Sequence, residues 1–144
     1  MKKIVSLLLV ASSIFVMGTA LAGNNEPKVI LNGEQMVFDV NPFIENDRTL
    51  VPMRAIFEAV GATVQWDEEK RTVHAVRMDG ENISGISLQI DSTDAFVNSE
   101  RMVLDVPAKI KDDRTFVPLR FVIESLGEKV EWDSENYAVK ITTD

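Results

Sequence analysis

The sequence predicts an α+β fold, a meandering antiparallel sheet packed on two short helices. Short stretches in which apolar and polar residues alternate are typical of strands, and two further stretches have apolar residues at helical spacing. Both kinds of stretch occur twice, at a constant offset of 66 positions. We therefore expect two tandem β-β-α-β-β units, residues 28–76 and 94–142, with a spacer, residues 77–93, between them.

The repeat is clearest where DRTLVPMRAIFEAVGATVQWD begins at Asp47 and DRTFVPLRFVIESLGEKVEWD begins at Asp113. Eleven of these 21 positions are identical. The similarity extends upstream, because residues 30–44 align with residues 96–110 at the same offset. A repeat of this length predicts that each copy is one supersecondary unit and that the copies share a core.

Each unit is predicted to begin with a β-hairpin. Asn32-Gly33 separates Ile30-Leu31 from Met36-Val37-Phe38, and Asn-Gly is the strongest two-residue turn signal. Asn98-Ser99 is a weaker version of this turn in the second unit. After each hairpin we expect a loop and then a helix.

Each helix is predicted to begin at a proline and to end before a glycine. Pro52 fits a first helical turn, where its fixed φ and missing N–H cost nothing. Gly61 suits a left-handed C-terminal cap. Pro118 and Gly127 take the same places in the second unit. The apolar stripes between them are Met53, Ile56, Phe57 and Val60, and Leu119, Val122, Ile123 and Leu126.

Alternating strands are predicted after each helix. Trp66 and Trp132 are in phase with the apolar residues of these strands, which predicts that they face the core. Stacking of these tryptophans on sugar rings is the alternative. Tyr137 aligns with Arg71 of the first unit, so we expect it to be exposed and name it as a candidate contact residue. A further strand in the spacer, at Ile86, Leu88 and Ile90 after the turn Asp79-Gly80, gives nine strands and two helices.

Two pairs of charged residues flank the apolar stripes. Arg54 and Glu58 are four positions apart, and Arg120 and Glu124 repeat the pair. We interpret both as structural ion pairs on the helix surface. The alternative is an acid/base carboxylate held by an arginine.

The triplets Asp47-Arg48-Thr49 and Asp113-Arg114-Thr115 are predicted to form tight loops before the helices. In this interpretation, Arg48 and Arg114 tie the loops to Asp39 and Asp105 on the hairpins. An arginine that faces a ligand is the alternative.

Residues 1–22 have the pattern of a secretory signal peptide: Lys2 and Lys3, an apolar stretch, and small residues up to Ala22. Retention of this segment as an anchor is the alternative. We expect residues 23–27 to be a short disordered N-terminus and residues 28–144 to be a single domain. This predicts a protein that is secreted or associated with the cell wall, without a membrane span after cleavage.

Composition excludes several classes of partner and chemistry. The net charge of −8 disfavours nucleic acid and anionic lipid. The chain has no cysteine and one histidine, His74, which is predicted to face solvent, so copper and zinc sites lack ligands. We predict no catalytic residue, no cofactor and no metal, while the acidic turns leave a structural calcium open.

The doubled segments NDRTLVPMRAIFEAVGATVQWDEEKRTVHAV and DDRTFVPLRFVIESLGEKVEWDSENYAVKI resemble the copper amine oxidase-like N-terminal domain of secreted bacterial proteins, also called a stalk domain. The resemblance covers Lys28 to Thr142 and implies an antiparallel sheet wrapped on helix. It also implies an accessory domain, separate from an oxidase core whose copper is held by three histidines. With one histidine in this chain, copper chemistry does not carry over.

We therefore expect a non-catalytic accessory or interaction domain that binds protein or cell-wall polymer. Two alternatives remain. One is an exported protein that binds a small ligand or an ion. The other is a small exported hydrolase that uses Glu58 or Glu124 together with Asp39 or Asp105.

Overall fold

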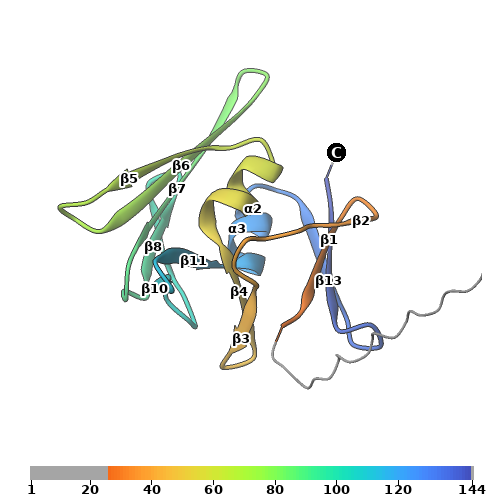
Figure 1. Ribbon diagram of the computed structural model, residues 1–144. Coiled ribbons are helices and arrows are strands. Elements are labelled where there is room, and N and C mark those ends of the chain that lie inside the picture. Colours follow the sequence, from red (N-terminus) through yellow and green to blue (C-terminus); the bar gives the residue numbers. More distant parts are fainter. Residues whose placement is uncertain (1–25, 144) are drawn as a thin grey trace, which may run out of the picture.

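The computed structural model describes residues 26–143, which form thirteen strands and two helices (Figure 1). The predicted signal peptide, residues 1–22, and positions 23–25 of the predicted disordered segment lie outside the described residues. Within residues 26–143, no helix is long and apolar enough to cross a membrane. The α+β class is confirmed, because the chain is mostly sheet with two short helices.

The first half of the chain contains β1 (Lys28–Leu31), β2 (Glu34–Gln35), β3 (Phe43–Glu45), β4 (Arg48–Pro52), α2 (Met53–Ala59), β5 (Thr63–Asp67) and β6 (Thr72–Asp79). Next comes β7 (Asn82–Gln89), the strand predicted in the spacer. The second half contains β8 (Asp94–Val97), β9 (Glu100–Val103), β10 (Lys109–Lys111), β11 (Arg114–Pro118), α3 (Leu119–Ser125), β12 (Lys129–Asp133) and β13 (Ala138–Thr142). These strands form three sheets, not the single predicted meander.

The tight loops predicted before the helices are β-hairpins. β3 pairs with β4 and β10 pairs with β11, both antiparallel. Asn46 and Asp47 connect the first pair with φ values of 50° and 63°, which is the left-handed geometry of a two-residue hairpin turn. Asp112 and Asp113 do the same with φ values of 52° and 60°. The β-β-α-β-β description of each unit is therefore wrong, because it lacks these strands.

The two repeated Asp-Arg-Thr triplets therefore lie partly in strands. Arg48 and Thr49 lie in β4, and Arg114 and Thr115 lie in β11, instead of in loops. Pro52 ends β4 as the residue immediately before α2, with φ −58° and ψ 128°. A proline is tolerated there because the N–H that it lacks has no helical partner in the first turn.

β4 and β11 pair antiparallel at the centre of the four-stranded sheet β10-β11-β4-β3. Val51 lies opposite Val117, and these residues occupy equivalent positions in the two copies of the repeat. α2 contacts β11, and α3 contacts β4. The two halves therefore meet at an approximate two-fold axis, with each helix packed partly on the other half.

The outer sheets exchange strands between the two halves. β1 and β2 join β13 and β12 in the order β12-β13-β1-β2, with β1 parallel to β13. β8 and β9 join β6 and β5 through β7, in the order β5-β6-β7-β8-β9. The two helices lie between these outer sheets (Figure 1). The prediction of an entirely antiparallel sheet is thus wrong at β1 and β13.

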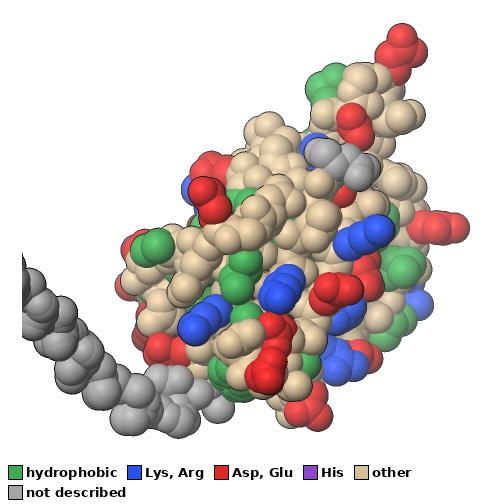
Figure 2. All heavy atoms as spheres, turned by 90° about the vertical axis from the view of Figure 1, so that its right-hand side faces the viewer, with side chains coloured by type: hydrophobic (Ala, Val, Ile, Leu, Met, Phe, Trp, Pro, Cys, Tyr) green, Lys and Arg blue, Asp and Glu red, His purple; other side chains and the backbone are tan. Residues whose placement is uncertain are grey.

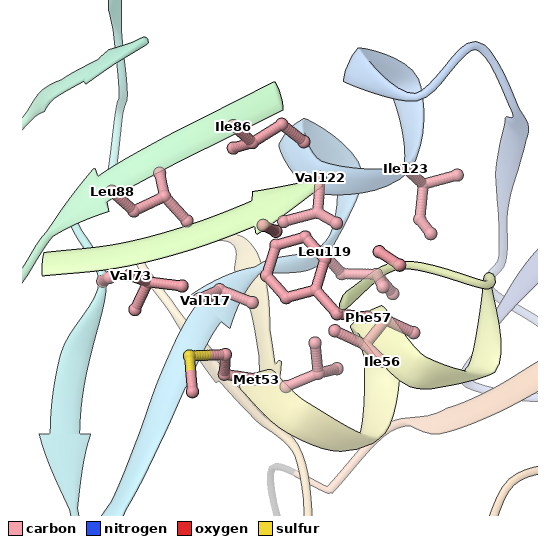
Figure 3. Close-up of a cluster of buried hydrophobic side chains, with 14 of the residues drawn as sticks. Met53, Ile56, Phe57, Val73, Ile86, Leu88, Val117, Leu119, Val122 and Ile123 are labelled. Atoms are coloured by element: carbon pink, nitrogen blue, oxygen red, sulfur yellow. The ribbon is translucent and has the colours of Figure 1, made fainter. Parts of the chain in front are cut away.

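The core forms where the two helices meet the strands. Phe57 of α2 and Ile123 of α3 are fully buried, and Figure 3 shows both in one cluster that also contains Val117 of β11. Val73 of β6 and Leu88 of β7 close the same cluster. Burial of one such side chain stabilises a fold by about 1.5–3 kcal/mol. Because the chain has no cysteine, no disulfide adds to the stability that this packing provides.

Arg77 joins the C-terminal ends of the two helices, a role that the sequence analysis missed. Its Nη2 donates to the carbonyl oxygen of Leu126 at 2.7 Å, and its Nη1 donates to that of Val60 at 3.4 Å. Nη1 also donates to Glu128 at 2.9 Å, and both side chains of this ion pair are nearly buried. A cation at two helix C-termini is favourable because carbonyl oxygens there lack helical partners.

Candidate interaction groove

An open groove of about 900 Å³ lies between α3, the strands β12 and β13, the residues after β9 and the β3–β4 hairpin. Its apolar lining includes Leu104, Val106, Phe121, Val130 and Val139. Its polar lining comes from both halves of the chain, because Arg48 belongs to β4 and Arg120 and Glu124 belong to α3. This volume falls within the range of pockets that hold a ligand.

Two aromatic side chains stand at this groove. The rings of Trp132 and Tyr137 meet edge to face, with centroids 5.2 Å apart and planes at 77°. Trp132 is 43% exposed and Tyr137 is 37% exposed. The prediction that Trp132 faces the core is therefore wrong, whereas the predicted exposure of Tyr137 is confirmed. Exposed aromatic side chains beside a groove are typical of binding surfaces.

Trp66, the equivalent of Trp132, has a different environment. It is partly buried and packs against the main hydrophobic core. Its indole N–H donates to Glu68 Oε1 at 2.8 Å. The core-facing prediction holds for this copy alone, so the two equivalent tryptophans have diverged.

Two ion pairs line the groove with the aromatic residues. Arg48 binds Asp105, and Arg120 Nη1 donates to Glu124 Oε2 at 3.0 Å. Arg120 Nη1 also lies 3.4 Å from the carbonyl oxygen of Val130 on the edge strand β12. All four charged side chains are 46–69% exposed, so the groove offers both donors and acceptors to a ligand.

The predicted arginines and aspartates do form ion pairs, but pairing within one unit is wrong, because each arginine binds the aspartate of the other half. Arg48 binds Asp105, and Arg114 binds Asp39, so each arginine crosses to the other copy of the repeat. The hydrogen bond from Arg114 lowers the pKa of Asp39 below its ordinary value of 3.8. The same hydrogen bond raises the pKa of Arg114. These pairs therefore connect the two interlocked halves at the protein surface.

The helix pairs predicted at four-residue spacing are both present. Arg54 Nη1 lies 3.5 Å from Glu58 Oε2, and both side chains are about three-fifths exposed. Of the two pairs, only Arg120 and Glu124 line the groove. The groove also contains Asp105, so it brings together Glu124 and Asp105, one of the carboxylate combinations that the hydrolase alternative requires.

The turn between β12 and β13 places Tyr137 at the groove. Asp133 accepts hydrogen bonds from the side chain of Asn136 at 2.8 Å and from its backbone N–H at 3.2 Å. These bonds, the side-chain bond first, lower the pKa of Asp133. Tyr137 itself has φ 51°, a left-handed conformation that asparagine and glycine adopt more readily. The turn thus fixes the ring beside Trp132.

His74 lies on the exposed surface of β6, away from this groove. Its Nδ1 is 2.9 Å from Ser87 Oγ on β7. The sequence analysis placed His74 on the solvent side correctly but did not identify Ser87 as its partner. Across the described part of the chain, no group of three or more His, Cys, Asp or Glu side chains is arranged to hold a metal ion.

A comparison of the sequence with models of protein families tests the resemblance described above. The family described as copper amine oxidase N-terminal domain matches residues 30–141. The chain belongs to this family. The N-terminal domain of copper amine oxidases is a non-catalytic accessory domain. A comparison with curated proteins found no match.

Membership of the copper amine oxidase N-terminal domain family does not imply a copper site in this chain. Copper sites in proteins draw on several imidazole or sulfur ligands. Here the single imidazole, His74, already bonds to Ser87, and no cysteine is present. The residues present therefore do not fit a copper centre.

Proposed function

We propose that this chain is a non-catalytic interaction module, secreted or held at the cell surface, that binds protein or cell-wall polymer through the groove beside α3. The exposed pair Trp132–Tyr137 carries the proposal. Tryptophan, tyrosine and arginine are the residues that dominate binding energy at interfaces, and the groove contains all three.

The secreted location rests on the signal-peptide pattern of residues 1–22. The non-catalytic role is supported by the family, whose domain is accessory to the oxidase. The surface charge suits a binding module as well. Figure 2 shows acidic and basic side chains interspersed on one face of the molecule, without a large single-sign patch. Such a surface stays soluble while a local groove supplies specificity.

A small hydrolase is the second candidate, because Glu124 and Asp105 share the groove. The environment of these carboxylates does not favour it. Both are more than half exposed, and each is bound by an arginine. A general acid of this type normally sits in an apolar, water-excluded surrounding. The interaction module therefore remains the function that the groove supports best.

Retention on insoluble material tests the proposed function. We would incubate the purified protein with isolated cell wall, with peptidoglycan and with immobilised secreted proteins, and measure the bound fraction. We expect retention on at least one of these, reduced by the double substitution Trp132→Thr and Tyr137→Asn. Absence of retention on all three would overturn the proposal. Release of reducing sugar or peptide from any of them, abolished by Glu124→Gln, would favour the hydrolase.

A further inference from the structure

We propose that the groove binds an uncharged glycan strand built of β-linked glucose-type rings, with Trp132 and Tyr137 as its stacking platform. This inference rests on the proposed function and names the ligand class of the same groove. It follows from three properties of the groove: the exposure of its aromatic pair, the pairing of both its arginines with carboxylates, and the contact of Arg120 with a carbonyl oxygen of the edge strand β12.

The aromatic pair is partly exposed to a ligand, Trp132 by 43% and Tyr137 by 37%. Because Trp132 and Tyr137 meet edge to face at 77°, their planes form a corner instead of a closed stack. Aromatic faces carry negative charge density, which attracts the weakly positive C–H groups of another molecule. Glucose-type rings in β linkage hold their hydroxyls around the rim, so both ring faces present C–H groups. Such rings fit this corner.

The groove lining has two arginines and three carboxylates, Asp47 among them, and both arginines are paired with a carboxylate. Arg48 binds Asp105, and Arg120 binds Glu124. A neighbouring pair of sugar hydroxyls can donate to a carboxylate and accept from a guanidinium at once, without adding a charge. A polyanion, in contrast, would meet a chain of net charge −8. Charge complementarity thus favours a neutral, hydroxyl-rich ligand.

An extended polypeptide is the occupant that the groove favours less. A peptide that adds to a sheet edge needs free backbone groups on that edge. β12 is the edge strand here, and the carbonyl oxygen of Val130 already faces Arg120 Nη1 at 3.4 Å.

Tryptophan fluorescence tests the inference directly, because the chain has only two tryptophans. In a Trp66→Phe background, Trp132 is the single reporter beside the groove. We would titrate this variant with cellohexaose, chitohexaose, polygalacturonate and an extended peptide of mixed sequence. We expect a saturable change with cellohexaose or chitohexaose and a much weaker response to the other two probes. Tighter binding of the peptide or of polygalacturonate would overturn the glycan assignment.

Calorimetry with the same oligosaccharides compares the affinities of two matched variants. Trp132 and Phe96 are each 43% exposed, but Phe96 lies on the far sheet, in β8, outside the groove. We expect Trp132→Thr to weaken binding at least about tenfold, and Phe96→Thr to change it less than about twofold. Arg120→Gln is expected to weaken binding, whereas Arg54→Gln, at the equivalent position of the repeat, is not.

Folding is checked by the melting temperature of each variant. If Trp132→Thr does not fold, Tyr137→Asn replaces it, since asparagine tolerates the left-handed φ of 51° at that position. Equal binding by the Trp132→Thr and Phe96→Thr variants would overturn the inference. So would the absence of any binding of cellohexaose and chitohexaose at about 10 mM. Retention on immobilised secreted proteins without oligosaccharide binding would leave the proposed function standing while this inference fails.

Discussion

Arg114 donates two hydrogen bonds to the same oxygen of Asp39, at 2.7 Å from Nη2 and 3.1 Å from Nε. Arg114 opens the strand β11 in the second half of the chain, and Asp39 follows the first hairpin. In the equivalent ion pair, Arg48 belongs to the first half and Asp105 to the second. The most recognisable charged residues of the repeat thus fasten one copy to the other.

Acid should weaken the fold through Asp39 and Asp133. Their pKa values are lowered from 3.8 in the folded protein, so the unfolded chain takes up protons first as the pH falls. Their contribution to stability is therefore present above the ordinary pKa and is lost as the pH falls through the lowered values. We expect the free energy of unfolding in urea to fall in that window.

Asp39→Asn removes one part of this dependence. We expect the variant to be less stable than the parent at about pH 7 and to approach it at a pH below the lowered pKa of folded Asp39, where this carboxyl is protonated in both states. Arg114→Gln should have the same pH profile, because it removes the hydrogen bond that lowers the pKa. An equal difference at both pH values would refute this explanation.

Arg77→Met should destabilise the protein by about 3 kcal/mol, because it leaves Glu128 nearly buried without its cation. The helix-end carbonyls of Val60 and Leu126 lose their donor as well. The double variant with Glu128→Met should recover part of this loss. Arg101→Met, which breaks an exposed pair with Asp94, serves as the control and should cost less than about 1 kcal/mol. Chemical denaturation of the four proteins measures each value.

Gly61→Ala should lower stability by about 1 kcal/mol for a conformational reason alone. Gly61 has φ 84°, and a Cβ placed there meets no atom within 4 Å. The cost is therefore that of a left-handed backbone carrying a side chain. Gly85 is equally free of contacts but lacks a positive φ, so Gly85→Ala should be neutral or slightly stabilising. A similar loss of melting temperature in both variants would contradict the argument.

The two tryptophans should differ in their effect on stability. Trp66→Thr removes a side chain that packs on the core, so we expect a loss of about 2 kcal/mol. Trp132→Thr removes a side chain that is 43% exposed, and we expect a loss of less than about 1 kcal/mol. Thermal denaturation followed by circular dichroism provides the comparison. A larger loss of stability for Trp132→Thr than for Trp66→Thr would show that Trp132 belongs to the core.

Local features of the fold were predictable from single residues. The left-handed turns at Asn32-Gly33 and Asn98-Ser99 have positive φ at all four positions, as the turn signals indicated. Gly61 and Gly127 end their helices with φ 84°. The apolar stripes of both helices are buried. Each of these features depends on neighbours within a few positions, which is the range over which turn and helix patterns act.

The features that sequence analysis missed depend on distant partners. The turns at Asn46-Asp47 and Asp112-Asp113 were interpreted as loops because their short strands have no long alternating pattern. The exchange of strands between the halves leaves no local signal, since the same alternation suits either partner. The exposure of Trp132 is likewise set by tertiary packing, because its strand has the same phase as that of the partly buried Trp66.

The exchange of strands between the halves also bears on the order of folding. Lys28 of β1 pairs with Ala138 of β13, so β1 cannot form its native pairing until β13 has been synthesised. Contacts so distant in sequence impose a large entropy of chain closure before they contribute any stability, and proteins rich in them fold slowly. We therefore expect the domain to remain unfolded until β13 is present. In stopped-flow refolding, a chain truncated before β13 should show no cooperative folding phase.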